Sequence, residues 1–186
     1  MIPIGLMIVL ASPLQQAAAI PPPIPQATAD CARPVYATDQ LVCGDPPLRA
    51  LDATMRQRLR QIALPSSSWL EDQTAWLRRR SLCAFSARHR ACTIAAYRDR
   101  LAVLGVPLSA PPDARQVRCD DPGIVTRYGD DRLSMFYDAK GALVAVASSA
   151  TATDDWRPFV NLRGRGRRLT LQTVTGQKTR CTMFRP

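Results

Sequence analysis

Six cysteines constrain the fold of this 186-residue chain more than any other feature of its sequence. No two of them are spaced as Cys-x-x-Cys, and the single histidine, His89, leaves no Cys/His set that resembles a zinc site. An even number of cysteines is typical of a disulfide framework formed in an oxidising compartment. We therefore predict three disulfide bonds, two in the first half of the chain and one in the second. The cysteines are Cys31, Cys43, Cys83, Cys92, Cys119 and Cys181.

The N-terminal segment is similar to a secretory signal. Residues 2–14 are almost entirely apolar, and the alanines at 17–19 are the small residues that a signal peptidase accepts. We predict a signal peptide over residues 1–19, cleaved after Ala19, and a periplasmic or secreted mature protein. The apolar run is shorter than the roughly 20 residues that cross a bilayer, so we expect no membrane span in the mature form. Asp30 is unlike the small residue that precedes a lipidated cysteine, so we do not expect Cys31 to be lipidated.

Proline-rich segments divide the remaining sequence. Residues 20–30 predict an extended tether, and residues 107–118 predict a linker. Between them, residues 31–106 have apolar side chains at every third or fourth position, which is typical of amphipathic helices. The expected helices cover residues 48–62, residues 69–84 with Ser68 as the cap, and residues 94–104.

Residues 119–186 follow a different pattern, with short apolar runs separated by turns. The expected strands cover residues 124–128, 132–138, 142–148, 156–162, 168–174 and 178–184. A bond between Cys119 and Cys181 would tie the two ends of this segment together. The chain is therefore expected to be an α+β protein, a disulfide-stapled helical domain followed by a small antiparallel β-barrel or sandwich.

One face of the expected second helix combines apolar and polar side chains. Residues Gln73, Trp76, Leu77, Arg80 and Cys83 fall on this face. The apolar members are explained as core, but Gln73 and Arg80 need polar partners there. We expect Asp52 to pair with Arg80, and we favour a buried structural clamp of Asp52, Gln73, Trp76 and Arg80 over a functional polar site.

The order of these residues resembles the LprI-type lysozyme-inhibitor domain. The matching series comprises Cys31, Cys43, Leu48-x-x-Leu51-Asp52, Gln73-x-x-Trp76-Leu77-x-x-Arg80-x-x-Cys83, Cys92 and Tyr97-x-x-Arg100-Leu101-x-x-Leu104. The resemblance covers residues 31–104 and implies a helical periplasmic or cell-surface module with paired disulfides, whose protein partner is lysozyme. For an antiparallel helical hairpin we expect nested pairing, with Cys43 bonded to Cys83 and Cys31 bonded to Cys92.

The second half is more weakly similar to the MliC family of small β-barrel inhibitors of c-type lysozyme. The matching features are Tyr128, the apolar strand 143–147, the small-residue loop 148–151, Trp156 and Cys181. The resemblance implies that Ser148, Ser149 and Thr151 enter the lysozyme cleft. The alternative is a polar loop that only connects two strands.

The chain has a net charge of +10, which favours anionic partners. Arg163, Arg165, Arg167 and Arg168 form an arginine-glycine segment that could bind an anionic envelope polymer such as lipopolysaccharide or an acidic glycan. Nucleic acid is a poor partner because no aromatic residues are interleaved there and the chain is predicted to be exported. The alternative is an exposed hairpin that the arginines keep soluble.

We predict that the chain is not an enzyme and has no cofactor. His89 is flanked by two arginines, which favours a solvated side chain over a catalytic base. The paired acids are expected to serve in turns rather than to face one another across a glycosidase cleft. The preferred function is lysozyme inhibition by protein–protein binding. Because c-type lysozymes are basic, local acidic patches would have to offset the repulsion, and the candidates are Asp120, Asp121, Asp130 and Asp131.

Overall fold

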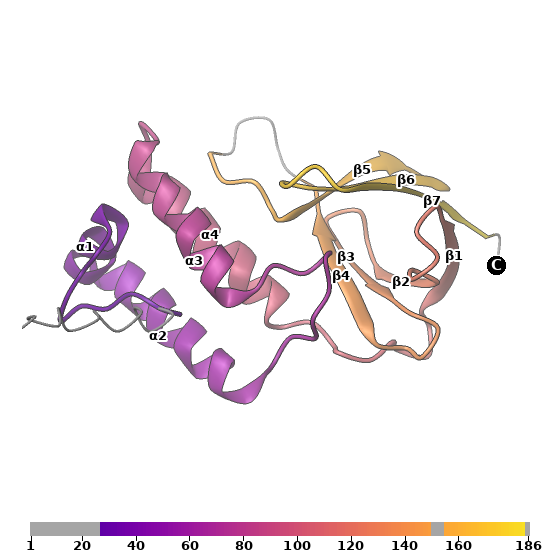
Figure 1. Cartoon of the computed structure of the whole chain (residues 1–186), viewed down its shortest axis with the longest axis horizontal. Coiled ribbons are helices and arrows are strands. Elements are labelled where there is room, and N and C mark those ends of the chain that lie inside the picture. Colours follow the sequence, from indigo (N-terminus) through magenta and orange to yellow (C-terminus); the bar gives the residue numbers. More distant parts are fainter. Residues whose placement is uncertain (1–26, 150–154, 185–186) are drawn as a thin grey trace, which may run out of the picture.

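The structure, a computed structural model, describes residues 27–149 and 155–184. The predicted signal peptide, most of the tether and Thr151 lie outside the described residues. The described chain has a helical N-terminal part followed by a β-barrel, so the predicted α+β class is confirmed and the second half is a barrel rather than a sandwich (Figure 1).

The helical part has one helix more than the sequence pattern predicted. Its helices are α1 (Ala37–Gly44), α2 (Pro46–Gln61), α3 (Gln73–Ser81), the 3₁₀ helix η1 (Leu82–Phe85) and α4 (His89–Val103). The short helix α1 was missed because Thr38 and Asp39 are buried on it, which obscures the apolar periodicity.

Aspartate side chains cap the starts of α2 and α3, and a proline begins α2. The Asp45 side chain accepts a hydrogen bond from the Leu48 amide, and Pro46 occupies the first helical position of α2. The second predicted helix begins later than expected, because Asp72 and not Ser68 caps α3. The segment before Asp72 does not continue the helix, since Trp69 is buried in the other half of the molecule.

The two disulfides of the helical part are local, so the nested pairing was wrong. Cys31 bonds to Cys43 and Cys83 bonds to Cys92. The nested pairing assumed a single helical hairpin. Instead, α1 folds the N-terminal segment back on itself, and the tight connection from η1 to α4 brings the Cα atoms of Cys83 and Cys92 within 5.6 Å.

Seven strands form the closed barrel, in sequence order around its circumference. They are β1 (Arg115–Cys119), β2 (Thr126–Gly129), β3 (Leu133–Tyr137), β4 (Leu143–Ser148), β5 (Val160–Arg165), β6 (Arg168–Thr173) and β7 (Lys178–Met183). Neighbouring strands are antiparallel except β4 and β5, which are parallel. Antiparallel pairing of β1 with β7 closes the barrel, and the predicted Cys119–Cys181 bond is confirmed between register partners of these two strands.

Two strands differ from their predicted positions. Residues 115–118, which the sequence analysis assigned to the linker, form most of β1, where only Val117 is buried and the strand pattern is correspondingly weak. The strand predicted over residues 156–162 begins at Val160. Trp156 precedes it on the crossover connection that the parallel pair β4 and β5 requires.

The helical part and the barrel exchange tryptophans. Trp69, from the segment between α2 and α3, is buried in the barrel core, and its indole N–H donates to Asp121 at 2.8 Å. Trp156, from the crossover between β4 and β5, is buried in the helical core, and its indole N–H donates to Asp99 at 3.0 Å. Each part therefore completes the core of the other.

Replacing Trp156 with alanine should lower the free energy of unfolding by about 3–5 kcal/mol, because it empties a buried aromatic site. Urea denaturation followed by tryptophan fluorescence measures this change. Phe85→Ala is the matched control: Phe85 is 86 % exposed, so its loss should change the free energy of unfolding by less than about 0.5 kcal/mol. Equal stability of the Trp156 variant and the wild type would contradict the exchange.

Candidate functional site

The predicted clamp residues surround a buried ion pair in the helical part. Arg80 is fully buried and pairs with Asp39 of α1, which is also fully buried. The predicted Arg80–Asp52 pair was wrong, because the unrecognised helix α1 supplies the acid. Arg80 and Asp52 are linked only indirectly: Arg80 donates to the Tyr97 hydroxyl at 3.2 Å, and that hydroxyl donates to Asp52 at 2.9 Å.

The remaining clamp residues join this network to its surroundings. Asp52 also accepts from the Ala29 amide at 3.2 Å and forms an ion pair with Arg56 at 2.7 Å. Gln73 donates to the Ala27 carbonyl at 2.6 Å and accepts from Arg100 at 2.9 Å. Trp76 packs edge-on against Tyr97, with ring centroids 5.3 Å apart.

These groups are placed to hold helices together rather than to act on a ligand. Burial raises the pKa of Tyr97 far above its usual range, so its hydroxyl stays protonated and remains a donor to Asp52. Burial lowers the pKa of Arg100 to about 10, which still leaves the guanidinium charged at neutral pH. Because Arg80 and Asp39 are fully buried, no solvent-borne substrate reaches them.

The contact between the two parts contains a second ionic cluster. Arg79 forms two hydrogen bonds to the Glu71 carboxylate, at 2.7 and 2.6 Å, and donates to the Arg157 carbonyl at 2.7 Å. Its guanidinium lies 3.9 Å from the centroid of the Trp156 ring. Arg79 therefore joins the helical part to the crossover segment through both charge and ring stacking.

The histidine and the acidic pairs have structural surroundings. Nε2 of His89 lies 3.0 Å from the hydroxyl of Thr38, but Thr38 is fully buried and cannot serve as a nucleophile for an external substrate. Burial, together with the charge of Arg80, lowers the pKa of His89. Within residues 27–149 and 155–184, no group of three or more His, Cys, Asp or Glu side chains could hold a metal ion.

The carboxylates proposed to offset repulsion from a basic lysozyme are engaged within the chain. Asp121 accepts from the indole of Trp69, and Asp131 pairs with Arg127 at 3.0 Å. Asp130 accepts from the amides of Leu133 and Arg132, which hold its pKa below the usual range. Asp120 accepts weakly from the Arg180 amide at 3.4 Å. These acids therefore have structural roles.

The loop expected from the MliC resemblance is described only at its start. Ser148 is half-buried at the end of β4, and Ser149 is exposed, with its amide donating to the Arg132 carbonyl at 3.3 Å. Thr151 lies outside the described residues.

The arginine-glycine segment forms the hairpin between β5 and β6. Arg163, Arg167 and Arg168 are exposed there. Gly164, in β5 beside the turn, has a φ of 112°, and a Cβ atom at this position would lie 2.2 Å from the Arg168 carbonyl oxygen, so only glycine fits there. The side chain of Arg165 lies outside the described part of this strand. The sequence prediction of an exposed basic hairpin is consistent with this placement.

An exposed apolar surface, which sequence analysis missed, borders the contact between the two parts. We call Leu82, Phe85 and Val174 the apolar loop surface; their exposed fractions are 60, 86 and 45 %. Leu82 and Val174 line a cavity of about 250 Å³ beside the Cys83–Cys92 bond and Trp156. The sequence signal is the short segment between two bonded cysteines that begins with Cys83-Ala84-Phe85.

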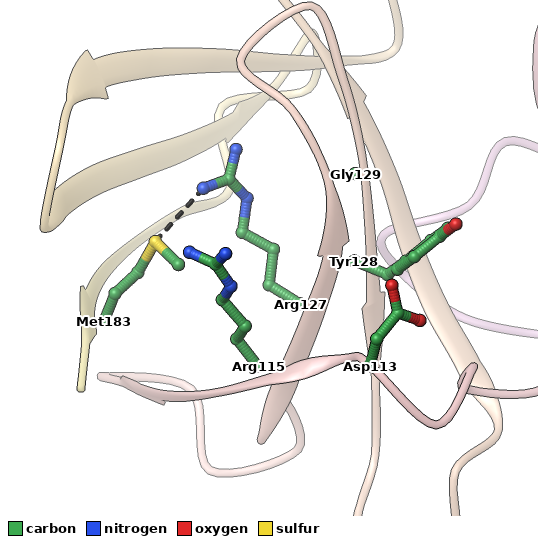
Figure 2. A pocket seen from close by; sticks show the side chains of 6 residues that line it. All are labelled: Asp113, Arg115, Arg127, Tyr128, Gly129 and Met183. Atoms are coloured by element: carbon green, nitrogen blue, oxygen red, sulfur yellow. Dashed lines mark hydrogen bonds between the residues drawn. The ribbon is translucent and has the colours of Figure 1, made fainter. Parts of the chain in front are cut away.

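A second cavity, of about 330 Å³, opens at one mouth of the barrel (Figure 2). Its lining residues are Asp113, Arg115, Arg127, Tyr128, Gly129 and Met183. The sequence analysis did not identify this site, because its members come from three strands and the preceding loop.

Comparison with known proteins gives one group of relatives. The chain is 31 % identical over 181 residues to proteins named lipoprotein LprI from Mycobacterium bovis and Mycobacterium tuberculosis. The alignment covers 90 % of this chain and 86 % of each relative, so it extends well beyond the helical segment that carried the sequence resemblance. No family model and no solved structure matches the chain. In the part of the chain that the structure describes, no helix has the length and apolar character of a membrane span.

The half-buried Asp99 carboxylate, which accepts from the Trp156 indole, gives a pH-dependent prediction. Burial raises the pKa of Asp99, against the opposing effect of the Trp156 hydrogen bond. The Asp99 carboxyl group has a higher pKa in the folded chain than in the unfolded chain, so the folded state keeps its proton to a higher pH. The stability that protonated Asp99 contributes is therefore lost as pH rises through its folded-state pKa. Asp99→Asn keeps an acceptor for the indole N–H but does not ionise. We expect the variant to gain stability relative to wild type as pH rises above the ordinary pKa range of an aspartate.

Urea denaturation at a series of pH values measures this difference. Asp130→Asn is a control with the opposite expected trend. The pKa of Asp130 is lowered in the folded chain, so the wild type should gain stability relative to that variant as pH rises. A free energy of unfolding of Asp99→Asn that falls relative to that of the wild type as pH rises would contradict the assignment.

Proposed function

This chain belongs to the LprI lipoprotein family, and from that premise we propose that it is an exported envelope protein that inhibits lysozyme by binding to it. The observation that carries the proposal is 31 % identity over 90 % of the chain. It is supported by the cysteine, tryptophan and arginine series through which the helical part resembles the LprI-type domain. Inhibition by binding needs no catalytic group of its own.

The apolar loop surface is the docking surface we propose. Exposed apolar patches on a monomer are typical of protein-binding sites, and aromatic side chains supply much of the binding energy at such sites. Phe85, at 86 % exposure, is the most exposed of the large apolar side chains in the described residues.

The loop that presents Phe85 is held in place before any partner arrives. The Cys83–Cys92 bond closes its base, Arg88 pairs with Asp155 at 2.9 Å, and Arg90 pairs with Asp45 at 2.6 Å. A preorganised loop loses little conformational entropy on binding, which favours affinity.

Charge around this surface fits the cleft of a glycan hydrolase. Such enzymes place two carboxylates across the scissile bond, and their clefts are locally acidic even where the whole protein is basic. Arg157 is exposed beside the apolar loop surface. Local attraction to this arginine opposes the long-range repulsion between two basic proteins, in place of the acidic patches that the sequence analysis suggested.

The MliC resemblance supplies a second proposed contact. The crossover that begins with Ser148 and Ser149 continues to Asp155, which pairs with Arg88 of the Phe85 loop. A partner bound at Phe85 would therefore lie close to the end of that crossover. We retain Ser148, Ser149 and Thr151 as proposed partner-binding residues on this basis.

We further propose export through cleavage of residues 1–19 and residence in the periplasm or outside the cell. All six cysteines form disulfide bonds, and such bonds persist in an oxidising compartment. The relatives are named lipoproteins, but Cys31 of this chain is bonded to Cys43. We infer that this chain is released without a lipid anchor on Cys31.

The mature chain should protect a bacterial substrate from lysis in a dose-dependent way when added to c-, g- or i-type lysozyme. Phe85→Ala should weaken inhibition at least about tenfold, because loss of an aromatic anchor costs more than about 1.4 kcal/mol of binding free energy. Val35→Ala is the matched control, since Val35 is an apolar side chain that is 71 % exposed but is not part of the apolar loop surface.

The lytic assay separates two failures. Absence of protection against all three lysozyme classes would contradict the proposed function. Inhibition by the Phe85 variant at wild-type potency would leave the function standing but reject the apolar loop surface as the docking site.

The alternative function is binding of an anionic envelope polymer, favoured by the exposed arginines of the β5–β6 hairpin. Binding to lipopolysaccharide or an acidic glycan should weaken steeply with ionic strength and on combined Arg165→Ala and Arg167→Ala substitution. Replacement of Arg78 and Arg98, exposed arginines on α3 and α4, is the charge-matched control. An equal loss of binding in both double variants would indicate that binding depends only on the net charge of the chain.

A further inference from the structure

Two arginines face each other at the mouth of the barrel. Arg115 of β1 and Arg127 of β2 are cross-strand partners in the antiparallel register. Arg115 is two residues from Val117, which is buried in the barrel core, and Arg127 pairs with Phe136, which is also in that core. Because alternate residues share one face of a strand, both guanidinium groups are directed to the inner side of the sheet. Figure 2 shows them side by side in the cavity.

Arg127 is fixed but one of its donors is poorly satisfied. Its Nε donates to the Ser134 hydroxyl at 2.9 Å, and its Nη2 donates to the Asp130 carbonyl and the Asp131 carboxylate. Its Nη1 donates to the sulfur of Met183 at 3.1 Å, and a thioether is a weak acceptor. This nitrogen lies on the cavity side of the guanidinium (Figure 2).

The positive charge of Arg115 is not offset in the same way. Its side chain is exposed, and among the described residues its guanidinium takes part in no hydrogen bond or ion pair. Like charges placed directly opposite on neighbouring strands destabilise a sheet. Asp131 balances only one of the two arginines, and Figure 2 shows the Asp113 carboxylate on the side of Tyr128, apart from the guanidinium pair.

We propose that this barrel mouth binds a small oxyanion between Arg115 and Arg127, as the phosphate or carboxylate group of a small molecule. Guanidinium groups bind both oxyanions through paired, charge-assisted hydrogen bonds. The cavity of about 330 Å³ is in the range of small-molecule sites, and barrel mouths are a common location for them.

The geometry gives the two arginines different roles. Arg127 is a preorganised donor, held by Ser134 and Asp131, and the oxyanion replaces the Met183 sulfur as the acceptor of Nη1. Arg115 is free to close on the anion from the opposite strand. The bound charge removes the repulsion between the two cations. This site is independent of lysozyme binding.

The test is a titration of the mature chain with inorganic phosphate at constant ionic strength, followed by NMR of the arginine Nε–H groups. Saturable binding should shift the signals of Arg115 and Arg127. Arg115→Ala should weaken binding about tenfold or more, because one charge-assisted donor pair is lost. Since Arg115 is exposed, this variant is expected to keep the barrel intact, which an unchanged unfolding midpoint verifies.

Arg118→Ala is the matched control. It removes the same charge from the same strand, but Arg118 is on the outer face, with its guanidinium 5.3 Å from the centroid of the Phe184 ring. A parallel titration with acetate assigns the ligand: tighter binding of phosphate indicates a phosphate group, and tighter binding of acetate indicates a carboxylate. Saturation by neither anion, or equal weakening in the Arg115 and Arg118 variants, would overturn the proposal.

Discussion

The exchange of two tryptophans between the helical part and the barrel is the interaction on which the rest of the structure depends. Trp69 fills the barrel core from the helical side, and Trp156 fills the helical core from the barrel side. Each indole N–H is satisfied by a carboxylate of the receiving part, so neither burial leaves an unpaired donor. The exchange aligns the Phe85 loop with Val174 of the barrel, and so creates the apolar loop surface.

No disulfide bond among the six cysteines links the two parts. Each disulfide closes within the helical part or within the barrel, over 12, 9 and 62 residues. The bonds therefore stabilise each part by restricting its own unfolded state. The relative position of the parts depends on packing, on the contacts of Arg79 with Trp156 and the Arg157 carbonyl, and on the Arg88–Asp155 ion pair. A surface shared by both parts is consequently sensitive to the burial of Trp156.

Sequence patterns predicted the helices and strands of this fold better than they predicted which buried side chains pair. Helical periodicity located α2 and α4, alternation located β2, β3, β4, β6 and β7, and the Cys119–Cys181 bond followed from the limits of the β segment. The pairing of Arg80 was missed because its acid, Asp39, belongs to a short helix with a polar buried face. Clamp residues Gln73 and Arg80 were recognised as buried polar groups, but the choice of partner depends on tertiary placement. The exposure of Phe85 was not predicted, since apolar character alone does not reveal exposure.

Native-state hydrogen exchange tests most directly whether the tryptophan exchange joins the two parts into one cooperative unit. The most protected amides of α4 and of β3 should exchange with the same free energy of opening in the wild type, because each part needs the other to complete its core. In Trp156→Ala the two sets should separate, with α4 opening more easily than β3. Different opening free energies for α4 and β3 in the wild-type protein, unchanged by the substitution, would contradict this account.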